Sequence, residues 1–180
     1  PSLGNGRQNG SRAGTTSAAL AFGGNNGSGG NFTEEFNKSA NVITPSAWAS
    51  GGNLNTARQR AASAGASQTS ALAFGGFEAP HNGPPLNNSE TYNGTAWSEG
   101  NNLGTARGNT SGFGTATAAV CGPGRGTPSG PFIQNTEEYN GTSWTAGNNS
   151  NTSGAAARSA SGTLTAGLIC GGFTPPSAAP

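Results

Sequence analysis

The sequence predicts an all-β protein in which one four-stranded unit repeats along the chain. Trp48, Trp97 and Trp144 are 49 and 47 residues apart (97 − 48 and 144 − 97). An apolar run that ends in glycine recurs between them, and so does a Glu-x-aromatic-Asn segment. These landmarks keep one order and one spacing, which indicates an internal repeat in which each copy is one supersecondary unit. A low-complexity chain without a fold would not keep three tryptophans in register.

The first strand of each unit follows a recurring arginine. These arginines are Arg7, Arg58, Arg107 and Arg158. The residues after them are small, as in residues 61–70 and 159–165. Small side chains suit an inner strand, where neighbouring units crowd together.

The second strand is a short apolar run that glycines end, as in residues 71–74 and 168–170. Such a run is typical of a strand buried on both faces. The runs end at Phe22-Gly23, Phe74-Gly75, Cys121-Gly122 and Cys170-Gly171. Because Cys121 and Cys170 stand where the other copies have phenylalanine, we expect two free, buried thiols that act as small hydrophobes.

The third and fourth strands form a hairpin that ends in tryptophan. The third strands are expected at residues 33–37, 89–93 and 136–140. Alternation places Glu34 and Phe36 on one face and Glu35 on the other. The pairs at 93–94 and 140–141 are Asn-Gly, which predicts type I′ turns because both central positions need positive φ. The tryptophan then opens the fourth strand.

The units run over residues 1–52, 53–101, 102–150 and 151–180, and the last is a half unit. One such sheet cannot bury both of its faces, whereas stacking it against its copies can. At 180 residues the chain is long enough for a single domain. We therefore expect one domain of stacked sheets.

This pattern resembles the kelch repeat of β-propellers. The resemblance rests on the Gly-Gly pairs at 23–24, 75–76 and 171–172, the Glu-x-aromatic-Asn segments, the tryptophans and the recurring arginine. It covers nearly the whole chain and departs at Gly122-Pro123 and in the insertion between Phe36 and Trp48. The resemblance implies a propeller of four-stranded blades with about 3.5 blades in this chain. We expect a parent chain that continues beyond Pro180, or self-association, to complete the ring.

The composition excludes several classes of function. Charged residues make up 8% of the chain and the net charge is +1, so no strong field attracts nucleic acid or an anionic membrane. No apolar run is long enough to span a bilayer. A polar but uncharged surface is typical of extracellular and virion-surface proteins.

The candidate ionic residues are the repeated arginines and the glutamates Glu34, Glu90 and Glu137. The arginines could form a ligand-binding ring near a central channel. Alternatively, each glutamate shares a strand face with a buried aromatic and needs a partner that an arginine can supply. The structural ion pair is the interpretation that we favour.

No residue pattern predicts catalysis, a metal or a cofactor. His81 is the only histidine and the chain has no aspartate, so neither a zinc or copper site nor a Ser-His-Asp triad can be built readily. Tyr92, Tyr139 and the tryptophans could stack on sugars, but their regular spacing favours core packing. The aromatics beyond the glycine pairs, Phe77, Phe132 and Phe173, are together with His81 the candidates for ligand contact.

The repeats are similar to degenerate kelch-like arrays in structural proteins of bacteriophages. That resemblance implies a non-enzymatic virion module, such as a tail fibre or appendage component, located on the virion or outside the cell. Its loops at residues 38–46, 78–87 and 123–131 would contact a host surface or glycan. The alternative is a secreted bacterial carbohydrate-binding or surface-filament protein.

Overall fold

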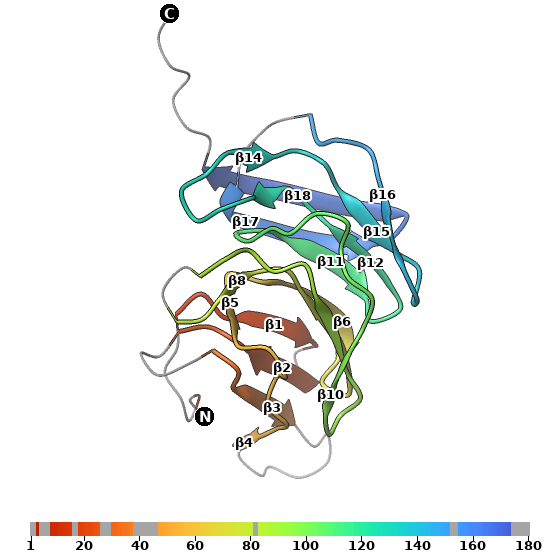
Figure 1. The fold of residues 1–180 in the computed structure, drawn as a ribbon. Helices are drawn as coiled ribbons and strands as arrows, with labels where there is room; N and C mark the ends of the chain where they lie inside the picture. The colour runs from red at the N-terminus through yellow and green to blue at the C-terminus, as the bar shows by residue number, and fades with distance from the viewer. Residues whose placement is uncertain are drawn as a thin grey trace, which may run out of the picture.

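The computed structural model describes residue 3 and residues 8–15, 18–25, 30–37, 47–80, 83–151 and 155–173. Within these ranges the chain forms β-strands and no helix (Figure 1). The all-β prediction is therefore confirmed. The insertion at residues 38–46 lies outside the described residues.

Three antiparallel sheets of four strands follow one another along the chain, and a two-stranded sheet comes last. Sheet 1 contains β1 (Ser11–Gly14), β2 (Ala18–Phe22), β3 (Thr33–Asn37) and β4 (Ala47–Ser50). Sheet 2 contains β6 (Ala62–Ser67), β7 (Ser70–Phe74), β9 (Ser89–Tyr92) and β10 (Trp97–Glu99). Sheet 3 contains β11 (Gly112–Thr115), β12 (Ala118–Cys121), β15 (Glu137–Tyr139) and β16 (Trp144–Ala146). Sheet 4 contains β17 (Ala155–Thr163) and β18 (Ala166–Phe173). Two further sheets of two short strands pair β5 (Arg58–Gln59) with β8 (Phe77–Glu78), and β13 (Gly124–Arg125) with β14 (Phe132–Ile133).

The sheets pack in series through their first strands. β1 contacts β6, β6 contacts β11, and β11 contacts β17. Figure 1 shows the same progression, from sheet 1 to sheet 4. The small side chains of these strands permit the close approach. Gly65 shows how tight it is, because a Cβ there would lie 3.1 Å from the Cβ of Ala13 on the first strand of sheet 1.

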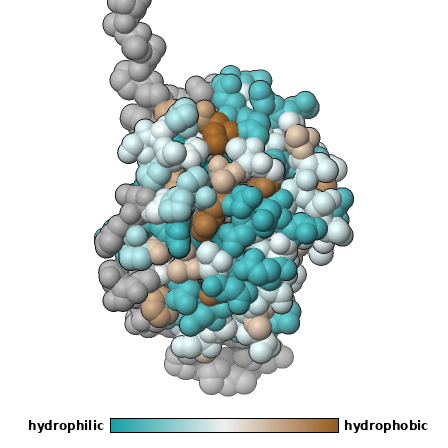
Figure 2. All heavy atoms as spheres, in the orientation of Figure 1, coloured by the Kyte–Doolittle hydropathy of each residue, from teal (hydrophilic) through white to brown (hydrophobic). Residues whose placement is uncertain are grey.

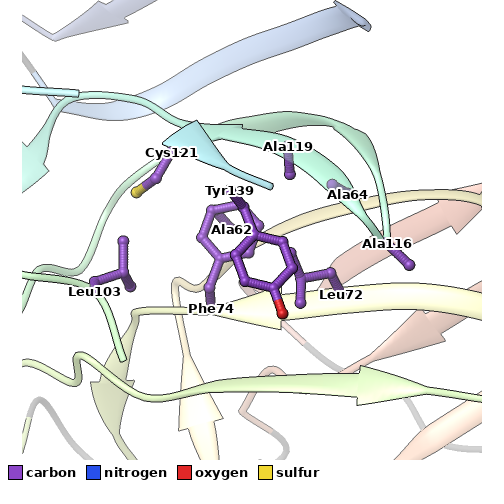
Figure 3. Packing of buried hydrophobic residues seen from close by; sticks show 9 residues of the cluster. All are labelled: Ala62, Ala64, Leu72, Phe74, Leu103, Ala116, Ala119, Cys121 and Tyr139. Carbon is purple, nitrogen blue, oxygen red and sulfur yellow. The ribbon is translucent and has the colours of Figure 1, made fainter. Parts of the chain in front are cut away.

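The core consists of one apolar cluster between each pair of neighbouring full sheets. The cluster between sheets 1 and 2 contains Leu20, Phe22, Leu54, Ala71, Ala73, Tyr92 and Trp97. The cluster between sheets 2 and 3 contains Ala62, Ala64, Leu72, Phe74, Leu103, Ala116, Ala119, Cys121 and Tyr139. In the second cluster the rings of Phe74 and Tyr139 lie side by side (Figure 3). Burial of each large side chain contributes about 1.5–3 kcal/mol, so the contacts between sheets hold the repeats together.

Two of the three tryptophans join neighbouring sheets. Trp97 of sheet 2 meets Phe22 of sheet 1 edge to face, with ring centroids 4.9 Å apart. Its Nε1–H donates to Thr33 Oγ1 at 3.0 Å. Trp144 of sheet 3 packs on Phe74 of sheet 2 at 4.8 Å. Sheets 2 and 3 therefore each place their tryptophan on the phenylalanine of the sheet before them.

The Tyr92 hydroxyl makes a further contact between sheets by donating a hydrogen bond to the Glu35 carboxylate. Burial, together with this bond, raises the pKa of Tyr92 to about 12. The phenol therefore stays protonated and keeps its role as donor at neutral pH.

The turns that join third and fourth strands differ from the prediction, because residues 93–96 and 140–143 form four-residue loops. Gly94 has a φ of 96°, but Asn93 is not among the positive-φ residues. The Asn93 side-chain oxygen accepts two backbone N–H bonds from the end of its loop, at 2.9 and 3.0 Å. The type I′ prediction at Asn93 and Asn140 was wrong, because asparagine closes the loop through its side chain.

The predicted equivalence of Arg158 with the other arginines was also wrong. The first strands of sheets 2, 3 and 4 each contain a positive-φ glycine, which fixes their common register: Gly65, Gly114 and Gly162. Arg58 and Arg107 lie seven residues before their glycine, whereas Arg158 lies only four before its own. Arg158 therefore sits within β17, opposite Gly171. The side chain of Arg158, like the whole of Arg7, lies outside the described residues.

The two cysteines are free but not equivalent. Cys121 occupies the position of Ala73, opposite the glutamate of the third strand. Cys170 occupies the position of Phe74. The residue paired with each of them lies three residues before the positive-φ glycine of the first strand. Cys121 is buried, as predicted, whereas Cys170 is exposed. The prediction for Cys170 was wrong because no sheet of the described chain packs on the face of sheet 4 that this position occupies.

Candidate functional site

The two ends of the stacked sheets differ in the length of their loops. At one end, two residues join first and second strands in sheets 2 to 4 (68–69, 116–117 and 164–165). At the other end, residues 75–88 and 122–136 join second and third strands. Long loops on a rigid scaffold are where binding residues concentrate. The long-loop end is therefore the candidate functional site.

A buried arginine supports each long loop from beneath. The Arg58 guanidinium lies 2.5 Å from Glu90 Oε1, and both side chains are fully buried. Its Nη1 donates to the carbonyl oxygens of Gly75 and Asn88, which are the first and last residues of the loop, at 3.0 and 3.1 Å. One side chain thus ties both ends of a loop to the third strand.

Arg107 makes the same set of contacts one unit later. Its Nη2 lies 2.6 Å from Glu137 Oε1, and its Nη1 donates to the carbonyl oxygens of Gly122 and Asn135 at 3.3 and 2.5 Å. Charge-assisted bonds of this kind are stronger than neutral ones. The two long loops are therefore held by two copies of one device.

The glutamates also hold the connections between sheets. Glu90 accepts backbone N–H bonds from Asn55 and Thr56 at 2.7 and 3.1 Å. Glu137 accepts the equivalent bonds at 2.6 and 3.1 Å from residues 104 and 105. The sequence carries a signal for this device that the sequence analysis missed. Residues 53–58 and 102–107 both read Asn-Leu-x-Thr-Ala-Arg.

These contacts show that Arg58 and Arg107 hold the loops and strands together and do not face a ligand. Burial lowers the pKa of Arg58, and the charge of Glu90 opposes that shift. Glu34 is buried at the equivalent position of sheet 1, opposite Ala21. The ion pairs that we favoured from the sequence are thus present at Arg58 and Arg107.

The loop aromatics fall into two groups. Phe77 is fully buried, and a Cβ on Gly108 would lie 2.4 Å from its ring. The prediction that Phe77 contacts a ligand was wrong, because the pairing of β8 with β5 folds its loop back onto the connection between sheets 1 and 2. Phe132 is half-buried. His81 and the side chain of Phe173 lie outside the described residues.

Phe132 forms a small platform with Arg125 on the β13–β14 hairpin. The Arg125 guanidinium carbon lies 4.3 Å from the centroid of the Phe132 ring, a cation–π arrangement. Arg125 Nη1 also donates to the Pro128 carbonyl oxygen at 3.4 Å. A planar cation stacked on an aromatic ring presents both hydrogen-bond donors and an apolar face to a ligand.

A central cavity of about 570 Å³ lies between the first strands of all four sheets. Its lining is largely glycine, alanine and serine, with Arg12 and Phe113 as the larger side chains. Among the described residues, no three His, Cys, Asp or Glu side chains lie where they could hold a metal ion. The described chain also contains no helix long and apolar enough to cross a bilayer.

The sequence matches no protein-family model and no curated protein sequence. The fold is similar to that of the solved structure of YjhT, with a TM-score of 0.70 and 13% sequence identity. The match covers 86% of this chain and 55% of that chain, so this chain spans about half the length of YjhT. At such identity the likeness shows the fold alone.

The two cysteines are expected to differ in reactivity. Burial raises the pKa of Cys121 to about 11, so almost no thiolate forms at pH 8, whereas Cys170 is exposed. In dilute native protein a maleimide should modify Cys170 alone, and Cys121 should react only after denaturation. Peptide mass mapping of the labelled chain measures this. Equal labelling of both thiols in native protein would contradict the packing around Cys121.

Proposed function

We propose that this chain is a kelch-like β-propeller module with about 3.5 blades and a non-enzymatic structural and binding role. Three features support the propeller: four-stranded antiparallel sheets in series, contact through their first strands, and a cavity lined by all four first strands. The similarity to YjhT is consistent with this arrangement.

We further propose that the module belongs to a bacteriophage virion, as part of a tail fibre or appendage. The low charge supports an extracellular setting, and the face in Figure 2 is mainly polar with few apolar areas. The resemblance to phage structural repeats supports the virion over a secreted bacterial protein. Neighbouring genes for capsid or tail proteins are the expected genomic context, and neighbouring genes for polysaccharide secretion would contradict it.

The observation that carries the binding role is the contrast between the two ends of the sheets. Short turns close one end, while the other carries two long loops fixed by buried ion pairs. A loop held in this way binds without a large loss of conformational entropy. The Arg125–Phe132 platform stands on one of these loops and suits the hydroxyl groups and apolar faces of a sugar.

Substitutions in the platform test this role. Arg125→Ala and Phe132→Ala are each expected to weaken binding to host cells or to a glycan array by about tenfold, which corresponds to about 1.4 kcal/mol. Ser98→Ala is the matched control, since Ser98 is exposed on β10, outside the long loops. Melting temperatures within a few degrees of wild type would confirm that folding is intact. Unchanged binding by both platform variants would contradict the proposal.

A further inference from the structure

The outward face of sheet 4 repeats a surface that the other sheets bury. In the common register Leu168 occupies the position of Leu20 and Leu72, two residues before the Phe position that Cys170 fills. Leu20 and Leu72 are fully buried, whereas Leu168 is 65% exposed. The neighbouring position 169 points toward sheet 3, because a Cβ on Gly122 would lie 2.7 Å from Ile169 Cδ1. Leu168 therefore faces away from sheet 3.

The outward face of sheet 1 carries the same residue pattern as the face that sheet 2 packs against sheet 1. Phe36 and Trp48 pack on each other at 5.3 Å, at the positions that Tyr92 and Trp97 hold in sheet 2. Tyr92 and Trp97 are buried against sheet 1, with exposures of 3% and 5%. Phe36 and Trp48 are only half-buried.

The same difference runs along the second strands. Ala71 and Ala73 are fully buried at the interface with sheet 1. Ala19 and Ala21, at the equivalent positions of β2, are only half-buried. Sheet 1 thus presents the apolar pattern with which sheet 2 covers its neighbour, and no sheet within the described residues packs on it.

We propose that a second copy of this chain docks head to tail, with sheet 1 of one copy on sheet 4 of the other. Trp48 of one copy would then lie over Leu168 and Cys170 of the other, as Trp97 lies over the β2 residues of sheet 1. The residues at these positions are uncharged, so the contact buries no unpaired charge. The docking of sheet 1 on sheet 4 does not depend on the function proposed above, whereas the closed ring rests on the propeller proposed there.

The half sheet contains the strands that this contact needs. Within the chain, the ring that receives Trp97 is Phe22, which lies on the second strand of sheet 1. Sheet 4 has its first and second strands, β17 and β18. Cysteine at position 170, where sheets 1 and 2 have phenylalanine, also leaves room for an incoming indole.

The contact uses different surfaces on the two copies, which makes it heterologous. Such contacts give a closed ring when the rotation closes and an open filament when it does not. Two copies contribute eight sheets, which lies within the range of closed propellers. A two-copy ring is therefore the expected assembly.

Light scattering and sedimentation of the 180-residue protein over a range of concentrations test the proposal. Two copies are expected at high concentration, and a protein that stays monomeric throughout would overturn the inference. Leu168→Glu and Trp48→Glu should each give monomers, because either change places a charge in the apolar contact. Thr165→Glu, in the exposed turn between β17 and β18, is the control and should leave the assembly intact.

Mixing the two monomeric variants distinguishes head-to-tail docking from a dimer in which both copies use the same face. The Leu168→Glu copy keeps an intact sheet 1 face, and the Trp48→Glu copy keeps an intact sheet 4 face. The mixture should therefore form a two-copy species, and failure to associate would overturn the head-to-tail arrangement. As a second readout, Cys170 should react with a maleimide more slowly in assembled wild type than in the Trp48→Glu variant. Equal rates would overturn the placement of Cys170 in the contact.

Discussion

Replacement of Arg107 by alanine is expected to lower the free energy of unfolding by about 3–5 kcal/mol. The guanidinium is fully buried and lies 2.6 Å from Glu137 Oε1. Its removal leaves the Glu137 carboxylate buried without its counter-ion and frees the carbonyl oxygens at the two ends of the long loop. Since 1 kcal/mol shifts Tm by about 2–4 °C in a chain of this size, Tm should fall by roughly 10 °C.

A double variant distinguishes the effect of losing the ion pair from the effect of leaving the Glu137 carboxylate buried without a counter-ion. Arg107→Met with Glu137→Gln removes both charges, while the glutamine oxygen can still accept one of the two backbone bonds, because Gly104 and Thr105 donate to different carboxylate oxygens. Because the worst consequence of breaking a buried pair is the unpaired ion, this double variant should be more stable than Arg107→Ala. The opposite ranking would show that the interaction with the loop carbonyls dominates.

Thermal unfolding followed by circular dichroism measures these effects. Arg12→Ala is the matched control, because Arg12 is an exposed arginine on β1 and surface substitutions usually change stability by less than about 0.5 kcal/mol. A Tm for Arg107→Ala within two degrees of wild type would mean that the ion pair contributes no stability.

The strand pattern could be predicted from sequence because each strand carries its own local mark. The third strand at Thr33–Asn37 was located to the residue, and Trp97 and Trp144 open fourth strands as expected. Alternation, apolar runs and glycine punctuation report local geometry directly. The all-β class and the order of the strands follow from these marks.

Register within strands could not be read from residue types. Arg158 and Cys121 were placed by spacing alone, although a shift of one residue exchanges the two faces of a strand. The backbone shows the true register through the positive-φ glycines, and Gly162 places Ala155 where the other units have arginine. Sequence shows which residue types recur, but not which of them share a position.

The candidate site depends on contacts between segments distant in sequence. Phe77 follows a glycine pair as Phe132 follows its own loop, yet β8 pairs with β5 and buries Phe77 completely. The Arg125–Phe132 platform likewise needs the pairing of β13 with β14. Such short pairings leave no periodic mark in the sequence, so the sequence could name candidate loop residues but could not show which of them are accessible.

Replacement of Trp97 by alanine is expected to lower the free energy of unfolding by about 3–5 kcal/mol, as large-to-small changes of buried aromatics do. Trp97 lies between Phe22 of sheet 1 and Tyr92 of its own sheet, at 4.9 and 5.0 Å. The substitution leaves a cavity between the sheets and removes the bond to Thr33. Sheets 1 and 2 are held by few other large side chains, so the loss cannot be compensated locally.

Trp48→Ala is the matched comparison, because the two tryptophans occupy equivalent positions of the sequence repeat but differ in burial in the structure. Trp48 is half-buried and contacts a ring of its own sheet. In protein dilute enough to be monomeric, chemical denaturation should show a loss for Trp48→Ala well below that for Trp97→Ala. Equal losses would mean that the outward face of sheet 1 is as well packed as the interface between sheets 1 and 2. That result would contradict the partly exposed apolar face of sheet 1 on which head-to-tail docking relies. A single pair of substitutions therefore tests both the packing between sheets 1 and 2 and the exposure of the outward face of sheet 1.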